Sequence, residues 1–94
     1  MAVIIVKAVY EVARIIGGYR QELELTGPAT VADVLELLIV RYGRELADKL
    51  PGDNHALRQT LIFVNGRNIA GLDGWQTVLH DGDELFIMTP LGGG

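Results

Sequence analysis

The last six residues are the part of this sequence whose composition points most directly to chemistry. The chain ends Thr89-Pro90-Leu91-Gly92-Gly93-Gly94. Pro90 cannot donate to a sheet ladder, and glycine combines a free backbone with the absence of a Cβ. Such a tail can leave the body of a domain and enter a channel that is too narrow for side chains. Its end offers a carboxylate, which becomes an electrophile once an enzyme adenylates it, so that a sulfur or amine nucleophile can attack the carbonyl.

This reading divides the chain into a folded domain of residues 1–89 and a flexible tail of residues 90–94. A frayed terminus or an engineered linker is the alternative explanation of three terminal glycines. On either explanation the sheet is expected to stop at Pro90.

The strand before the tail carries apolar residues in both of its alternating sets. Successive side chains of a strand point to opposite faces, so if Leu85 and Ile87 face a core, Phe86 and Met88 face away from it. An exposed Phe and Met on one strand indicate a docking patch for another protein. The alternative is that Trp75, or the segment from residue 50 to residue 59, folds over them.

The rest of the sequence lacks the residues of a self-contained active site. Neither cysteine nor serine occurs, which excludes thiolate metal sites and serine or cysteine nucleophiles. The two histidines, His55 and His80, have no metal-ligand spacing, and His80-Asp81-Gly82-Asp83 is typical of a turn whose side chains cap backbone groups. We therefore expect no metal site, no bound cofactor and no enzymatic activity in this chain alone.

Periodicity and turn signals predict the elements that would position these residues. Thr30 and Asp33 have the spacing of a capping box, and Asn65-Gly66 is a strong signal for a tight turn between strands. Strands are predicted at residues 2–9, 19–25, 60–64, 67–70 and 84–89, a main helix at 31–42 and a short helix at 44–50, with residues 10–16 ambiguous but compatible with a helical turn.

This order predicts an α+β domain with a mixed sheet of about five strands and one main covering helix. The expected shared core consists of Val6, Leu25, Val34, Leu38, Phe63, Leu85 and Ile87. With 94 residues, there is room for one modest core and little room for an enclosed active site.

Charge and hydropathy narrow the classes of partner. The net charge is −4, and the eight basic residues are spread along the chain, so nucleic acid is not an expected partner. The apolar start is predicted to be a strand and not a signal peptide, and no apolar run approaches the roughly 20 residues of a membrane helix. A cytoplasmic protein without membrane contact is therefore expected.

Three segments together resemble the sulfur-carrier proteins of the ubiquitin-like β-grasp superfamily. They are Val64-Asn65-Gly66, Leu79-His80-Asp81-Gly82-Asp83-Glu84-Leu85 and the ending Met88-Thr89-Pro90-Leu91-Gly92-Gly93-Gly94. The sequence is most similar to the small subunit of molybdopterin synthase and to archaeal ubiquitin-like small modifier proteins, with the thiamine sulfur carrier as a relative. It departs from the common pattern at Thr89 and Gly92, where a proline and a Ser or Thr are usual, and at Ala13, where many members carry Arg.

The resemblance implies a specific role for the tail. An E1-like enzyme would use ATP and magnesium to adenylate Gly94, next to Gly93, and the product would become a thiocarboxylate. The tail residues Pro90, Leu91 and Gly92 would then enter a partner, such as the large subunit of molybdopterin synthase or another sulfur acceptor. Phe86 and Met88 would correspond to outward-facing docking residues. The nucleotide and the metal would be bound by the activating enzyme.

Two other functions remain open at this level. The same tail could join the chain to lysines of target proteins, because the activation step is shared. Alternatively, the chain could be a non-covalent binding module that uses Phe86 and Met88 and leaves the tail idle.

Overall fold

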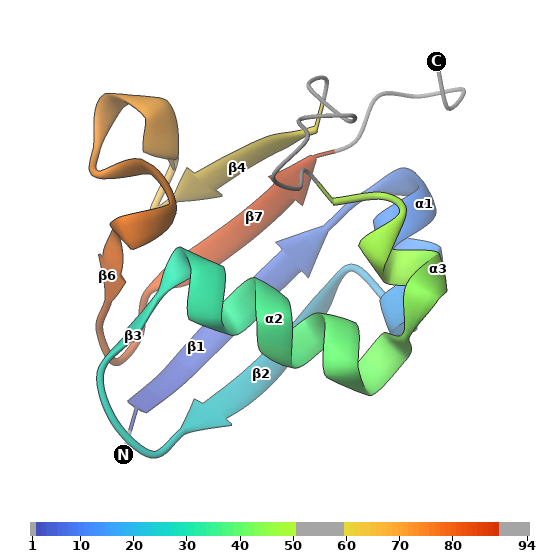
Figure 1. Cartoon of the computed structure of the whole chain (residues 1–94), viewed down its shortest axis with the longest axis horizontal. Helices are drawn as coiled ribbons and strands as arrows, with labels where there is room; N and C mark the ends of the chain where they lie inside the picture. Colours follow the sequence, from blue (N-terminus) through green and yellow to red (C-terminus); the bar gives the residue numbers. More distant parts are fainter. Residues whose placement is uncertain (1, 51–59, 89–94) are drawn as a thin grey trace.

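The computed structural model describes residues 2–50 and 60–88, which form a five-stranded sheet crossed by a helix (Figure 1). The elements are β1 (Ala2–Ala8), α1 (Tyr10–Ile16), β2 (Arg20–Leu25), β3 (Ala29–Thr30), α2 (Val31–Tyr42), α3 (Arg44–Ala47), β4 (Leu61–Val64), β5 (Arg67–Asn68), β6 (Val78–Leu79) and β7 (Glu84–Met88). The strand order is β2-β1-β7-β4-β5, with β1 and β7 parallel and the other neighbours antiparallel. This is the α+β, ubiquitin-like β-grasp fold that the sequence predicts.

The first two strands form the expected hairpin, and their connection contains a helix. Residues 10–16, ambiguous in the sequence, are helical as α1 and bury Val12, Ala13 and Ile16. The helix ends at Gly17, which has a φ of 88° and donates its N–H to the Ala13 carbonyl at 3.0 Å. Glycine adopts this left-handed conformation without steric cost, so the Gly17-Gly18 pair lets the chain turn back into β2.

The main helix, α2, begins at the predicted capping box. The Thr30 hydroxyl accepts from the Asp33 N–H at 3.2 Å, and the Asp33 carboxylate accepts from the Thr30 N–H at 3.0 Å. The apolar stripe of the helix is buried against the sheet, as its 3.6-residue spacing requires. Its buried members are Val31, Val34, Leu35 and Leu38.

The core lies between the sheet and these helices. Six of the seven predicted core residues are buried: Val6, Leu25, Val34, Leu38, Leu85 and Ile87. The prediction for Phe63 is wrong, because Phe63 is only half-buried and its neighbours Ile62 and Val64 are buried instead. Phe63 lies directly opposite Phe86 in the antiparallel β4–β7 pair, and directly opposed residues share a face of the sheet. It therefore points away from the helices.

Three short features differ from the sequence prediction. The short helix predicted at residues 44–50 is shorter, because α3 ends at Ala47. A two-residue ladder pairs β3 with β6, joining the start of α2 to the segment before β7. The predicted strand at residues 67–70 is shorter, because the chain forms a 3₁₀ turn at Ile69–Gly71 in which Asn68 Oδ1 accepts from the Ala70 N–H at 2.8 Å. Among the described residues, none of the helices has the length and hydropathy to cross a membrane.

Candidate functional site

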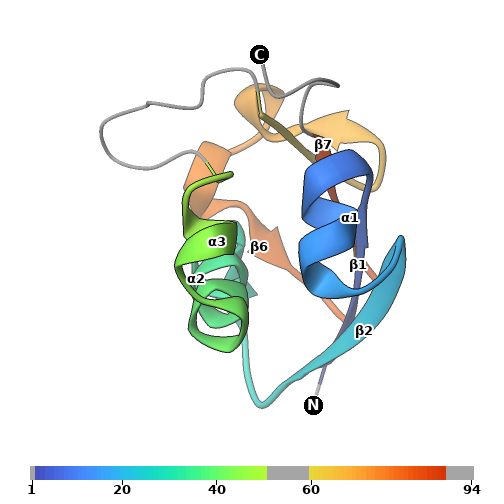
Figure 2. The same ribbon diagram turned by 90° about the vertical axis from the view of Figure 1, so that its right-hand side faces the viewer.

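The last strand, β7, separates two apolar surfaces. Leu85 and Ile87 are fully buried under the helices, whereas Phe86 and Met88 are half-buried on the opposite face. Figure 2 shows α2 and α3 together on one side of β1 and β2. The predicted division of β7 into an inward and an outward apolar set is thus confirmed, and the use of the outward set for docking stays a prediction.

The neighbouring strand extends the outward apolar surface. Phe63 lies opposite Phe86, with ring centroids 6.0 Å apart and planes tilted by 37°, and Leu61 lies opposite Met88. We call these four residues the open-face patch. Sequence reasoning missed Leu61 and Phe63, because β4 is apolar at every position and its alternation cannot say which set faces the core. The strand register supplies that information.

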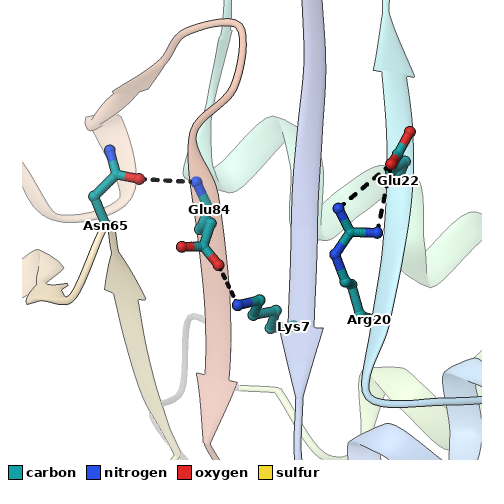
Figure 3. Close-up of polar contacts among 5 residues, drawn as sticks. All are labelled: Lys7, Arg20, Glu22, Asn65 and Glu84. Atoms are coloured by element: carbon teal, nitrogen blue, oxygen red, sulfur yellow. Dashed lines mark hydrogen bonds and ion pairs between the residues drawn. The ribbon is translucent and has the colours of Figure 1, made fainter.

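Charged side chains lie beside the open-face patch on β1 and β7, and one strand further away on β2. Lys7 forms an ion pair with Glu84, and Arg20 contacts Glu22 within β2 (Figure 3). Lys7 is also in register with Phe86, so the Lys7–Glu84 pair adjoins the aromatic centre of the patch. Exposed pairs of this kind contribute little to stability, roughly 0–1 kcal/mol, and act mainly on the orientation and choice of a partner.

The Asn65-Gly66 turn closes one end of this surface. Both residues have positive φ, 51° and 83°, as a two-residue hairpin turn of this type requires. The Asn65 amide donates to Asp83 Oδ1 and its oxygen accepts from the Glu84 N–H, each at 3.0 Å (the latter bond is drawn in Figure 3). The turn thereby fixes β4 against the start of β7.

The acidic turn before β7 acts through its side chains on backbone groups, as predicted. Asp81 Oδ1 accepts from the Val3 N–H at 2.8 Å, and Asp83 Oδ2 accepts from the His80 N–H at 2.7 Å. The His80 ring is exposed, with Nδ1 3.7 Å from Asp83 Oδ2. Over residues 2–50 and 60–88, no group of three or more His, Cys, Asp or Glu side chains could hold a metal ion. His55 lies outside the described residues.

The predicted reactive residues follow directly on the open-face patch in the chain. Gly93 and Gly94, and the tail residues Pro90, Leu91 and Gly92, lie outside the described residues. Their point of departure is nevertheless defined, because Met88 ends β7 between β1 and β4. Six residues follow Met88, and even a fully extended chain of that length spans only about 20 Å. A protein that acts on Gly94 must therefore lie near this end of the sheet.

One of the two alternative covers for the outward face is ruled out. Trp75 is half-buried and packs against the buried core cluster that includes Leu85 and Ile87, which is the helix side of the sheet. It therefore does not cover Phe86 and Met88. The other proposed cover is the segment from residue 50 to residue 59, of which residues 51–59 lie outside the described residues.

Comparison with known proteins identifies relatives of two kinds. The chain is 39% identical over 66 residues to small archaeal modifier protein 3 of Haloferax volcanii, covering 70% of this chain and 71% of the relative. It is 35% identical over 65 residues to a protein of Archaeoglobus fulgidus that is provisionally named a sulfur carrier, covering 69% and 74% of the two chains.

The fold is also shared with solved structures. One from Pyrococcus furiosus, provisionally named subunit 1 of a molybdopterin converting factor, superposes with a TM-score of 0.78 at 25% identity, covering 97% of this chain and all of that one. The model of the ThiS family matches residues 4–94. With these relatives, the match shows that the chain belongs to the ThiS family, in which small ubiquitin-like proteins serve as sulfur carriers and protein modifiers.

Proposed function

We propose that this protein is a sulfur carrier whose C-terminal glycine, Gly94, is activated by an E1-like enzyme and converted to a thiocarboxylate. The observation that carries the proposal is the position of the open-face patch. Phe86 and Met88 lie on the strand that precedes the glycine tail in the chain, and both are half-exposed on the sheet face opposite the described helices. A docked enzyme would therefore hold the tail close to its own active site.

The proposed chemistry needs no catalytic group from this chain. A carboxylate oxygen of Gly94 attacks the α-phosphorus of ATP, and pyrophosphate leaves. A sulfur nucleophile from the activating system then attacks the carbonyl carbon, AMP leaves, and a C–S bond replaces the C–O bond. The magnesium ion that neutralises the phosphates would be bound with ATP by the enzyme. Because ATP is consumed, we place this protein in the cytoplasm.

Residue types along the surface support a division of roles. Phe63 and Phe86 supply an aromatic anchor of the kind that dominates protein–protein binding energy. The Lys7–Glu84 pair beside them offers one charge of each sign, which a partner can match to fix its orientation. In the tail, Pro90 and Leu91 would contact the channel entrance, and Gly92 and Gly93 would pass where side chains do not fit.

The acceptor of the sulfur is proposed to be the large subunit of molybdopterin synthase, with this chain as the small subunit. Support comes from the resemblance of the turn, last strand and tail to that subunit, and from the Pyrococcus furiosus structure of related name. The thiocarboxylated chain, mixed with the large subunit and a pterin precursor, should yield the dithiolene product. If no dithiolene product forms and the chain instead transfers its sulfur to a thiazole synthase, the chain would be assigned to thiamine synthesis.

ATP–pyrophosphate exchange with the cognate E1-like enzyme tests the activation step. The full chain should support exchange, and a variant that lacks Gly93 and Gly94 should not, while it keeps the same thermal unfolding midpoint. Equal exchange with both chains would contradict the proposal, because the carboxylate would then not depend on the glycine pair.

Conjugation to target lysines is the second candidate, favoured by the 39% identity to a protein named as an archaeal modifier. The last basic residue is Arg67, so trypsin would leave all of residues 68–94 on a modified lysine. A protease that cleaves after Leu91 would instead leave three glycines. Lysines carrying a branched triglycine remnant, absent from cells that express the variant without Gly93 and Gly94, would establish this function.

A further inference from the structure

A second surface feature lies at the end of the sheet from which the tail departs. An open cleft of about 470 Å³ lies between α1 and the turn at residues 17–19, lined by Val9, Tyr10, Ala13 and Arg14 together with that turn. Figure 1 shows α1 beyond the tips of β1 and β7. The cleft is therefore at the same end of the molecule as Met88.

Two tyrosines flank this cleft and are unusually exposed. The exposed fraction is 75% for Tyr19 and 51% for Tyr10. Tyr10 also has a φ of 56°, a left-handed conformation that is a genuine outlier for a bulky side chain. Such strained residues cluster at functional sites, where the surrounding structure holds them in place.

Ion pairs of Arg14 link the helical wall of the cleft to α3. The Arg14 guanidinium contacts Glu11 Oε2 at 2.9 Å and Glu45 Oε2 at 2.7 Å, which ties α1 to α3. Because two carboxylates already neutralise Arg14, the cleft is not set up to attract an anion. Its aromatic and aliphatic lining suits an apolar side chain.

The strand register places the cleft near the end of β7 that carries Met88. The Ala8 N–H donates to the Tyr19 carbonyl at 3.0 Å, and Ala8 is in register with Ile87 on β7. Val9, which lines the cleft, follows Ala8 in the chain, and Met88 of the patch follows Ile87. The cleft and the open-face patch therefore lie at neighbouring ends of β1 and β7, with the Lys7–Glu84 ion pair on the strands beside them.

We propose that this cleft is a second docking point for the enzyme that activates Gly94, and that it receives an apolar or aromatic side chain of that enzyme between Tyr10 and Tyr19. The inference rests on the proposed function. The six residues after Met88 reach at most about 20 Å, so the enzyme must lie against this end of the sheet to act on Gly94. Tyrosine is among the residues most enriched at binding hot spots, because it buries a large ring and keeps a polar tip.

Two variants test the cleft without unfolding the chain. Tyr19→Ala removes an exposed ring, and Tyr10→Asn removes the other while Asn tolerates the left-handed backbone. In ATP–pyrophosphate exchange with the cognate E1-like enzyme, each should raise the KM for this chain by about 10-fold and leave kcat within about 2-fold. Tyr19→Phe, which keeps the ring, should retain most of the affinity. Val40→Ala, on an 81% exposed residue of α2, is the matched control and should change neither constant.

The outcomes separate the two proposals. If wild-type exchange is normal and both tyrosine variants keep the wild-type KM, the cleft proposal is overturned and the activation step stands. If the wild-type chain supports no exchange at all, the proposed function fails and the docking point fails with it. If Val40→Ala raises KM as much as the tyrosine variants, the effect is not specific to the cleft, and the proposal is also overturned.

Discussion

The two faces of β7 are built from adjacent residues and differ in burial. Leu85 and Ile87 are completely buried under the helices, while Phe86 and Met88 on the other face are half-exposed beside the Lys7–Glu84 ion pair. Both sets are apolar, so hydrophobicity alone does not distinguish them. The comparison shows that alternation along one short strand can place apolar side chains both in the core and on the surface, and the surface set is the one proposed to dock.

The largest expected effect is a difference in stability between substitutions on the two faces of β7. Ile87→Ala removes a fully buried side chain and should lower the free energy of unfolding by about 3 kcal/mol, because it leaves a cavity in the core. Met88→Ala, one residue on, should cost less than about 1.5 kcal/mol. Urea unfolding of both variants measures the difference. Equal losses would mean that the two faces are not distinct.

The next largest effect is expected on the affinity for the activating enzyme, which should depend on the outward face of β7. Phe86→Ala should weaken the affinity for the activating enzyme by roughly 10-fold or more, as expected of an aromatic anchor. The loss of its contact with Phe63 should cost the fold only about 1 kcal/mol. Titration calorimetry gives the affinity, with Leu37→Ala on the exposed side of α2 as the control. An unchanged affinity for Phe86→Ala would remove the open-face patch from the docking surface.

A smaller effect, on stability alone, is expected from the N-terminal cap of α2 on the helix side of the sheet. Thr30→Ala removes the hydroxyl that caps α2 and should lower the free energy of unfolding by about 1 kcal/mol, with affinity for the enzyme unchanged. Thr30→Ser keeps the hydroxyl and should keep most of the stability. A loss of affinity in Thr30→Ala would show that the helix side also contributes to docking.

The smallest effect concerns the ion pairs of α1. The hydrogen bond from Arg14, and secondly its positive charge, hold the pKa of Glu11 below the ordinary value of 4.5. A lowered folded-state pKa means that the pair stabilises the fold above about pH 4.5 and that this contribution is lost as pH falls through the folded pKa. Between roughly pH 5 and pH 3, the thermal unfolding midpoint should therefore fall less in Glu11→Gln than in the wild-type chain, because the variant has no carboxylate to protonate at this position. Identical pH profiles for variant and wild type would contradict the pairing.

Local signals in the sequence predicted a large part of this architecture. The Thr30–Asp33 capping box, the Asn65-Gly66 turn and the acidic turn before β7 depend on residues within a few positions of one another, and all three form as expected. The alternation along β7 also assigned Phe86 and Met88 to the open face, because the strand has one register with respect to the core.

What the sequence could not provide depends on contacts between distant segments. The outward direction of Phe63 follows from its pairing with Phe86, 23 positions away, and the all-apolar β4 leaves both faces possible. The β3–β6 ladder has two residues in each strand, too few for any periodicity. The cleft beside Tyr10 was not predicted either, because it forms only when α1 packs at the end of the sheet.

The intact mass of the chain after activation tests the central claim most directly. After incubation with the E1-like enzyme, ATP and a sulfur donor, replacement of one oxygen by sulfur at Gly94 should add about 16 Da. The variant without Gly93 and Gly94 should keep its mass, and Phe86→Ala should gain the sulfur more slowly. An unchanged mass for the full chain, with an enzyme that thiocarboxylates its own established carrier, would contradict the account.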